Sequence, residues 1–482
     1  VEKRAFQSVG PENLPPIRPQ VIVEQGRPVV VFRQFRYHGF KTFGWDMFWC
    51  RLNGEAWDPP ARLSPCLSSP DTGACILPFD GRYIGMFPAL EHDGEAGRTY
   101  GHRVEFHEFN ESQRLPRFEI AGDKARPYSI PRRYKDIAIE PPPLPAIYPG
   151  RTLIWGDLHM HSTYSKCVGA ADGSPAEKLR FARDSLGCRV FTLTEHTQEL
   201  SSPEQAWCMD QLERAAGDRG VVLYCSEPPF CPGRHTNVYA RDRDIYERLL
   251  MIVVSQKGDR RLLYRHIREA LPPGSVFVMQ HFHGDITGTD EMRASFDPVL
   301  EVAMEAVQGR CNGLLEDDGG ALPFPAQFLN MGCTIGLVGG TDHFRSGPNH
   351  LGLTGFWVKE VSAEGVWEAI GSRHTTAMSN AKIAMAASLN SQPMGSGVRI
   401  DSSAPIRVKL WASCGRKIRR ATLVTDAGIL AWVPVNAMSA DLELRAPAPG
   451  PGRHWYVPTV EVDTAFGHST PGYGHTSPFF VG

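Results

Sequence analysis

The sequence of 482 residues lacks several features that would each indicate a class of protein. It has 51 Lys and Arg against 53 Asp and Glu, so no basic excess is available to neutralise a phosphate backbone, and we expect no nucleic acid partner. No run of about 18 apolar residues occurs, and we expect no membrane segment. No Walker A, Rossmann or G-x-S-x-G motif joins a strand to a helix. Nucleotide-driven and serine-nucleophile chemistry are therefore poorly supported.

The cysteines lack any paired spacing. All 11 are scattered without a C-x-x-C motif, which favours reduced thiols over a disulfide framework or a thiolate zinc site. The first ten residues, "VEKRAFQSVG", contain no apolar stretch of the signal-peptide type. We therefore expect a cytoplasmic protein, although the missing initiator Met leaves export with a removed signal open.

A proline-rich segment divides the chain. "IEPPPLPAIYPG", residues 139 to 150, cannot be helix or central strand and is typical of an extended connector. Before it, "RPVVVFRQFRYHG" and "TYGHRVEFHEFN" are rich in β-branched and aromatic residues, as strands are. We expect a β-rich region over 1–140 and a linker over 141–150.

The middle of the chain, residues 151 to 380, alternates short apolar runs with helix-like segments. The runs include "RTLIWGDLHMH", "CRVFTLTEH", "GVVLYCSE", "SVFVMQHFH", "VAMEAVQ" and "CTIGLVGGTDH"; the helical segments include "SPAEKLRFARDSL", "DIYERLLMIVVSQK", "DRRLLYRHIREAL" and "EGVWEAIGSR". This alternation predicts an α/β fold with a parallel sheet, either open or closed as a barrel. Residues 381 to 482 return to strand-like pieces such as "IRVKLWAS" and "RATLVTDAGILAWVPV", which favour a small β-sandwich.

Ligand-type side chains recur at the ends of the apolar runs. His159 and His161 are two residues apart, so a strand would project both to one side, with Asp157 beside them. Because the carboxyl ends of parallel strands meet at one edge, the residues at the ends of the other runs should join them. These residues are Glu195, His196, Glu227, His281, His283, Asp342 and His343. Two further candidates are His235, which opens "HTNVYA", and Glu305, which lies within "VAMEAVQ". The recurrence favours a metal site over unrelated caps and core histidines.

The residue types limit the chemistry of this site. Imidazole and carboxylate without thiolate suit Zn, Mn or Fe, and the candidates exceed the needs of one four-coordinate ion. We expect two or three divalent ions. Such ions lower the pKa of bound water and hold it for attack on carbon or phosphorus.

The motifs "GDLHMHSTYS", "LTEH", "CSE", "HTNVYA", "VMQHFH", "MEAVQG" and "GGTDH", in this order, resemble the PHP superfamily (polymerase and histidinol phosphatase). The resemblance covers roughly residues 151 to 380. It implies a distorted (β/α)7 barrel with a di- or trinuclear metal centre. The stretch from 352 to 383, followed by "QPMGSG", resembles the DUF3604 and CehA/McbA-like branch, which includes hydrolases of aryl carbamate esters.

The resemblance also implies roles for individual residues. His159, His161, Glu227 and Asp342 would hold one ion, and Glu227 would bridge to a second. The implied set is completed by His196, His235, His281 and His343, with Glu227, Asp342 and His343 as the catalytic candidates. This chain departs from the pattern in having Lys166 and Cys167 after "HSTYS", adjacent Asp342 and His343, and Gln280-His281 where two histidines are usual. Either His281 or His283 could therefore be the ligand.

Other candidates have two interpretations each. Glu305 could orient a metal ligand or bind an ion itself, or it could pair with Arg310. Glu195 is as readily structural as functional. Arg234, Arg310 and Arg345 lie near predicted ligands and could bind an anionic group of the substrate, or pair with nearby acids. The runs "FGWDMFWCR" and "GRKIRR" are typical of core and of a solvated face, respectively.

Together these features predict a metal-dependent hydrolase that uses a metal-bridging hydroxide to cleave an ester, carbamate or amide bond of a small organic substrate. A phosphoesterase acting on a small phosphorylated molecule is the alternative enzyme. A non-catalytic ligand-binding protein on a barrel scaffold is the alternative of another class. The substrate, the metal and the oligomeric state do not follow from the sequence.

Overall fold

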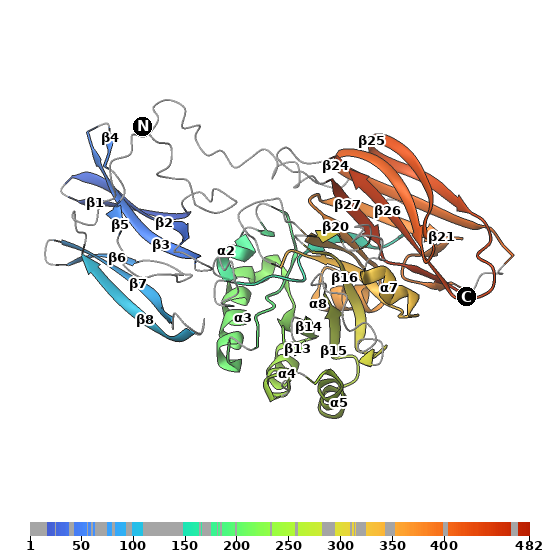
Figure 1. Ribbon diagram of the computed structural model, residues 1–482, viewed down its shortest axis with the longest axis horizontal. Coiled ribbons are helices and arrows are strands. Elements are labelled where there is room, and N and C mark those ends of the chain that lie inside the picture. Colours follow the sequence, from blue (N-terminus) through green and yellow to red (C-terminus); the bar gives the residue numbers. More distant parts are fainter. Residues whose placement is uncertain are drawn as a thin grey trace. The chain divides into compact units, whose positions relative to one another are not determined.

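The computed structural model describes residues 17–24, 26–37, 43–54, 56–58, 61–62, 75–79, 82–92, 99–108, 148–162, 165, 175–180, 182–183, 186–197, 200–231, 234–255, 259–281, 295–308, 311–312, 314, 324–342, 352–398, 403–463 and 471–482. The chain divides into two compact units, of which one contains β1 to β8 and the other contains every strand from β9 onward (Figure 1). The predicted boundary at residue 140 and most of the predicted linker lie outside the described residues.

The N-terminal unit is built from antiparallel strands. β1 (Ile17–Glu24), β2 (Arg27–Tyr37), β3 (Phe43–Asn53) and β4 (Ala56–Trp57) follow one another in one sheet, and β5 (Ala61–Arg62) pairs with β3. β6 (Cys75–Phe79), β7 (Arg82–His92) and β8 (Thr99–Glu108) form a second sheet. Val31 lies opposite Trp49 across β2 and β3, and both are buried. The strands predicted here are confirmed, and the aromatic run in β3 contributes to the core.

The first sheet of the second unit contains parallel and antiparallel parts. β9 (Thr152–Gly156), β10 (Val190–Phe191) and β11 (Val221–Val222) run parallel, as their separation by helices requires. β19 (Gly352–Val358) runs antiparallel to β9, and β20 (Thr375–Ser379) runs antiparallel to β19. β9 and β19 are almost wholly buried, which explains their continuous apolar sequences.

The second sheet carries the other predicted strands. Its order is β12 (Tyr224–Ser226), β14 (Arg234–Ala240), β15 (Val276–Gln280) and β16 (Glu301–Gln308), with β18 (Gly336–Gly340) paired to β16. Two short strands, β13 (Pro229–Cys231) and β17 (Cys311–Asn312), pair with β14 and β16. β14 runs antiparallel to both β12 and β15, which corrects the expectation of a parallel sheet. The connection from β12 to β14 is too short for a crossover helix, so the chain must turn back on itself.

The predicted closed barrel is not present as such. The described strands belong to separate sheets within a mixed α/β architecture, and no single sheet among them closes on itself. Two isolated parallel bridges, Met160 to Asp342 and His196 to Glu227, link the two sheets where their strands end. The regular strands end before the ligand-type residues, so only isolated bridges form between the two sheets at this point.

Helices cover the strands of the second unit. α4 (Arg243–Ser255), α5 (Arg260–Ala270) and α8 (Ala363–Gly371) lie where helices were predicted, while the predicted helix at 174–186 is described as α2 (Pro175–Arg180). α3 (Ser202–Ala216) was not predicted, although Ser201 and Glu204 form a capping box at its start. α3, α4 and α5 follow one another in the sequence, and α4 packs against both of the others (Figure 1). Among the described residues, no helix is both long enough and apolar enough to cross a membrane.

The C-terminal strands continue the first sheet. β24 (Ile406–Thr425) and β25 (Gly428–Ala446) form a long hairpin, so the two pieces read from the sequence are parts of two continuous strands. Pro434 is tolerated because β25 pairs with β24 on one side, and no partner for its other side occurs among the described strands. β26 (His454–Val462) pairs with β27 (Gly472–Thr476), which pairs with β20. One sheet therefore contains strands from both sides of the predicted boundary between residues 380 and 381.

The C-terminal strands should be needed for folding of the second unit. Val457, Trp455 and Phe480 share a buried cluster with Met304 of β16 and Phe328 of α7 (Phe324–Asn330). We expect a fragment of residues 130–380 to lose cooperative thermal unfolding by circular dichroism, because β20 and this cluster lose their partners. A fragment of residues 130–482 is the control and should melt cooperatively. Equal cooperativity of the two fragments would contradict this dependence.

Candidate metal centre

Five imidazoles surround the carboxylate of Glu227. The residues that form the cluster follow β9 (His159, His161), β10 (His196), β12 (Glu227), β15 (His281) and β18 (Asp342). His235 is near the start of β14 rather than after its end. Because β14 runs antiparallel to its neighbours, its amino end lies at the same edge as their carboxyl ends. The two sheets thus deliver all these side chains to one place.

One oxygen of Glu227 faces the two histidines that follow β9. Its Oε2 atom lies 3.1 Å from Nε2 of His159 and 3.1 Å from Nε2 of His161. Oδ1 of Asp342 lies 3.5 Å from the first of these nitrogens and 3.2 Å from the second. We call His159, His161, Glu227 and Asp342 the first subsite.

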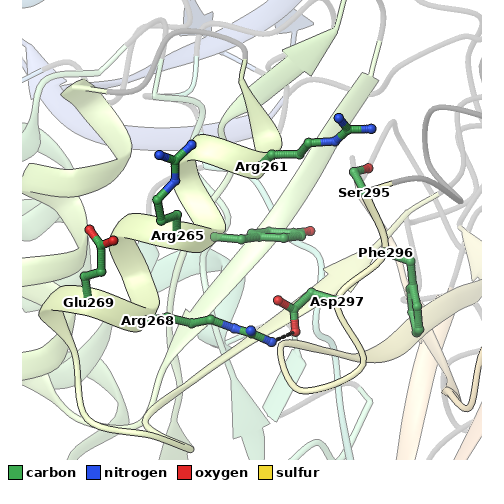
Figure 2. A pocket seen from close by; sticks show the side chains of 8 residues that line it. Arg261, Arg265, Arg268, Glu269, Ser295, Phe296 and Asp297 are labelled. Carbon is green, nitrogen blue, oxygen red and sulfur yellow. Dashed lines mark hydrogen bonds and ion pairs between the residues drawn. The ribbon is translucent and has the colours of Figure 1, made fainter.

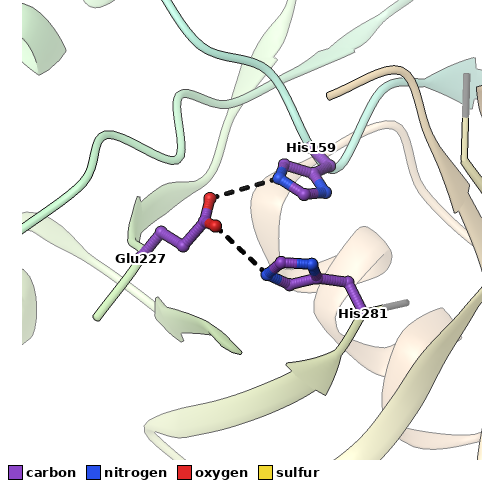
Figure 3. A group of neighbouring side chains, drawn as sticks. All are labelled: His159, Glu227 and His281. Carbon is purple, nitrogen blue, oxygen red and sulfur yellow. Dashed lines mark hydrogen bonds and ion pairs between the residues drawn. The ribbon is translucent and has the colours of Figure 1, made fainter. Parts of the chain in front are cut away.

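The other oxygen of Glu227 faces the remaining three histidines. Its Oε1 atom lies 2.7 Å from Nδ1 of His235, 3.2 Å from Nε2 of His281 and 3.5 Å from Nε2 of His196. Figure 3 shows the two oxygens of Glu227 directed at His159 and His281 on separate elements. We call Glu227, His196, His235 and His281 the second subsite, and Glu227 is common to both.

The geometry and the atom types fit divalent cations. Ligands of a tetrahedral ion with bonds of about 2.0 to 2.1 Å lie roughly 3.3 to 3.4 Å apart. Most of the nitrogen–oxygen separations around Glu227 and Asp342 are between 3.1 and 3.5 Å. Three overlapping groups of His and carboxylate atoms within 4.8 Å of one another occur among the described residues. Nitrogen and oxygen ligands without thiolate suit Zn, Mn or Fe.

Residues behind the histidines fix how the rings are turned. Nδ1 of His159 lies 3.1 Å from Oε1 of Glu305, and Nδ1 of His161 lies 3.1 Å from Oγ of Ser165. These partners occupy the Nδ1 atoms and leave both Nε2 atoms directed at Glu227. Glu305 therefore orients His159, one of the two roles considered for it. Ser165 was not singled out in the sequence, since a hydroxyl in "HSTYS" carries no distinctive signal.

Asp157 does not join the ligands, contrary to the expectation from its spacing. Its Oδ1 atom accepts hydrogen bonds of 3.0 Å from the backbone N–H groups of His159 and Thr341. β9 ends at Gly156, so the alternation of a strand no longer governs where Asp157 points. Asp157 instead ties the segment that carries the two histidines to the segment that carries Asp342.

The backbone at the end of β18 is specialised. Asp342 has a φ of 62°, unusual for a residue other than glycine, and its N–H donates a 2.7 Å bond to the carbonyl of His159. A Cβ atom on Gly340 would lie 2.3 Å from Oε1 of Glu305 and 2.3 Å from Cβ of His159. The glycine of "GGTDH" therefore allows β18 to approach His159 closely.

Burial and mutual attraction set the charges in the ion-free protein. Burial alone raises the pKa of Glu227, but the imidazoles of His161, His281 and His159 outweigh it and hold this pKa well below its usual range. Burial alone lowers the pKa of His161, yet the carboxylates of Glu227 and Asp342 raise it to about 9. Burial alone also lowers the pKa of His159, but the carboxylates of Glu305, Asp342 and Glu227 outweigh it and hold this pKa well above its usual range. The carboxylates of the cluster thus favour positive charge on both imidazoles.

Other groups in the cluster respond mainly to burial. Burial lowers the pKa of His196 to about 4, which leaves this imidazole neutral and able to bind a cation. Burial also raises the pKa of Asp157 to about 6 and of Glu305 to about 7, although hydrogen bonds to Asp157 and the imidazole of His159 beside Glu305 oppose this. A dry site with excess negative charge favours uptake of positive charge.

Several predicted residues cannot be placed in this cluster. His343, His283, Arg310 and Arg345 lie outside the described residues, and only the backbone of Arg234, at the start of β14, is described. The predicted roles of these residues stay predictions.

A solvent-facing pocket lies elsewhere on the unit. It has a volume of about 430 Å³ and is lined by side chains of α5 and of residues 295–297 (Figure 2). Arg268 pairs there with Asp297. The lining contains no residue of the cluster, so this pocket does not expose the carboxylate of Glu227.

No protein-family model matches the sequence, and no curated protein matches it. Among solved structures, the chain is similar to a two-domain protein from Bacteroides vulgatus containing a predicted PHP-like metal-dependent phosphoesterase. The identity is 15% and the TM-score 0.39, over 70% of this chain and 98% of that one. It is also similar to the lesion-specific endonuclease EndoQ from Pyrococcus furiosus, at 15% identity and a TM-score of 0.32, over 46% of this chain and 56% of that one. At these values neither neighbour's activity transfers to this chain.

Glu227→Gln should remove metal from both subsites, because they share this carboxylate. We expect metal affinity to fall by roughly a hundredfold or more, beyond what loss of an orienting residue costs. Metal content per protein, measured by inductively coupled plasma mass spectrometry, checks this. His454→Ala is the control, since His454 pairs at 2.9 Å with Asp426 in the C-terminal strands. Full metal content in Glu227→Gln would refute the assignment.

Metal affinity should also depend on pH. A raised pKa means that the imidazolium of His161 persists up to a pH of about 9, so a cation must expel its proton. We therefore expect affinity for Mn²⁺ to rise by about tenfold per pH unit for each proton displaced, with the contribution of His161 ending above about pH 9. Isothermal titration calorimetry in buffers of different ionisation enthalpy measures both the affinity and the proton release. Affinity that stays constant from pH 6 to 9 would contradict this account.

Proposed function

We propose that the protein is a metal-dependent hydrolase that cleaves an ester, carbamate or amide bond of a small organic substrate. The observation that carries this proposal is the position of Glu227, whose two oxygens face two different groups of histidines. A carboxylate shared in this way is suited to bridging two cations. Burying these carboxylates and imidazoles without cations costs free energy, so stability alone does not explain their presence. Paired cations at this position would instead serve hydrolysis.

The buried charge supports two ions. Five carboxylates of the cluster and its surroundings are buried, together with the ammonium group of Lys178, which interacts with Asp157. These carboxylates are Asp157, Glu195, Glu227, Glu305 and Asp342. With all five carboxylates ionised and the imidazoles neutral, this group and Lys178 would carry four net negative charges, which two divalent cations would balance. A third ion would need further ligands from the undescribed part of the chain, such as His343.

The side chains of the chain would divide the work of hydrolysis. Divalent cations bound here would lower the pKa of a water molecule toward neutrality and stabilise negative charge that develops on the substrate. Glu227 stays ionised because its pKa is low, and so holds its position between the subsites. Asp342 completes the first subsite and, with His343, is the candidate for accepting the proton of the attacking water. Glu305 keeps Nε2 of His159 directed inward.

The fold and the family form part of the same proposal. The two bridges at the strand ends, from Met160 to Asp342 and from His196 to Glu227, support a distorted ring of seven strands around the cluster. The residues of the cluster belong to the motifs that resemble the PHP superfamily. We therefore place the chain in that superfamily, in its DUF3604 and CehA/McbA-like branch, with an anionic group on the substrate as the partner of Arg234, Arg310 or Arg345.

Parallel assays test the activity. Protein stripped with chelator and reloaded with Zn²⁺, Mn²⁺ or Fe²⁺ would be given aryl carboxyl esters, aryl carbamates, anilides, aryl phosphomonoesters and DNA. We expect metal-dependent turnover of one of the first three classes, abolished in Asp342→Asn and retained in His454→Ala. Turnover of phosphomonoesters alone would make the protein a phosphoesterase, and turnover of DNA would overturn the expectation of no nucleic acid partner. Ion-loaded protein without any turnover would indicate a binding protein.

A further inference from the structure

Two histidines of the second subsite lie directly across a strand pair from each other. Thr236 of β14 is opposite Gln280 of β15 in the antiparallel register. His235 and His281 lie one residue beyond this last pair of the register, and their ring centroids are 6.2 Å apart. The side chains of Thr236 and Gln280 bond to each other, and Gln280 also bonds to Tyr264 of α5, whereas the two imidazoles face Oε1 of Glu227. The two pairs of side chains therefore point away from each other.

The amide of Gln280 is held by three hydrogen bonds in the buried interior. Its Oε1 atom accepts a 3.2 Å bond from the hydroxyl of Thr236. Its Nε2 atom donates a 2.8 Å bond to Oε2 of Glu301 and a 3.2 Å bond to the hydroxyl of Tyr264. The bonds to Thr236 and Glu301 together determine which way the amide is turned. Gln280 therefore connects β14, β15, β16 and α5.

The far end of this network is anchored as well. Glu301 is fully buried, lies 3.4 Å from a guanidinium nitrogen of Arg260 and accepts a 3.2 Å bond from the N–H of Asp297. Arg260 also donates a 2.8 Å bond to the hydroxyl of Tyr264. A buried, paired carboxylate of this kind is fixed in place, because any displacement leaves charges unpaired.

We propose that Gln280 is a positioning residue for the second subsite, and that with Thr236 and Glu301 it holds His235 and His281 at Oε1 of Glu227. This inference rests on the proposed two-ion centre. The hydrogen bonds and ion pairs of this network join the side chains of Thr236, Gln280, Glu301, Tyr264 and Arg260. None of these contacts includes His159, His161 or Asp342. Loss of the network should therefore weaken the second ion more than the first, which it reaches through the contact of the His281 ring with the His159 ring, at 4.4 Å between centroids.

Two substitutions remove the network with little change of shape. Gln280→Met keeps the length of the side chain but removes the amide, and Thr236→Val removes only the hydroxyl. Thr236→Ser restores a hydroxyl and is the rescue variant. Thr459→Val is the matched control, because the hydroxyl of Thr459 is equally buried but bonds His475 in the C-terminal strands. Thermal melts establish whether each variant is folded.

Stripped proteins would be titrated with Co²⁺, with calorimetry and the visible absorption of the bound ion as readouts. We expect two ions in the unsubstituted protein, and a second ion weakened by about 10- to 100-fold in Gln280→Met and Thr236→Val. The first ion should bind within about threefold of its original affinity, as should both ions in Thr236→Ser and Thr459→Val. If Gln280→Met does not fold, the three threonine variants decide the question.

The outcomes separate this inference from the proposed function. Two ions with unchanged affinities in Gln280→Met and Thr236→Val, or equal weakening of both ions, would overturn the positioning role and leave the hydrolase proposal standing. An unsubstituted protein that binds no ion at all would overturn both.

Discussion

The buried carboxylate of Glu227 is the group on which the rest of the second unit depends. An ionised carboxylate placed in a dry interior is stable only when positive charge or hydrogen-bond donors surround it. Here five imidazoles supply those partners, and the attraction is strong enough to hold the pKa of Glu227 well below its usual range despite burial. Nothing else in the described part of the chain explains why so many histidines are gathered at one point. Cations would satisfy the same requirement while keeping the imidazoles neutral.

The sheets are shaped by this requirement. Strand pairing gives way to isolated bridges at the positions of Asp342 and Glu227, so that backbone groups remain paired while the side chains turn inward. Asp342 has a positive φ although it is not glycine. Gly340 has no side chain that would separate β18 from His159. Local strain of this kind persists where the surrounding contacts determine it, and it accumulates at functional sites. The regular core beneath, built from β9, β15 and β19, supplies the stability that offsets it.

Several side chains of the cluster are held in place by partners outside it. Glu305 bonds the ring of His159, Ser165 bonds the ring of His161, and Asp157 binds the backbone that carries them. On the opposite face of β14 and β15, Thr236, Gln280 and Glu301 form a separate network behind His235 and His281. Orienting contacts of this type set ring tautomers and ligand geometry, and metal affinity depends on them. The two sets of supporting residues are different, although the subsites share Glu227 and the rings of His159 and His281 are in contact.

The sequence by itself determined which residue types gather in the cluster, since the recurrence of His, Asp and Glu at the apolar runs predicted that His159, His161, His196, Glu227, His235 and Asp342 would meet, with either His281 or His283. The structure brings these six together with His281. It also determined most strands, because apolar runs of β-branched and aromatic residues pair locally. Tertiary structure decided what spacing could not. Asp157 is turned to the backbone because β9 ends one residue earlier, and His235 reaches the centre from the start of a strand because β14 runs antiparallel. The two oxygens of Glu227 face different groups of histidines because the two sheets meet at their edges. Periodicity fixes the face of a residue only within its own strand, whereas the partner across a sheet is chosen by contacts between segments far apart in the chain.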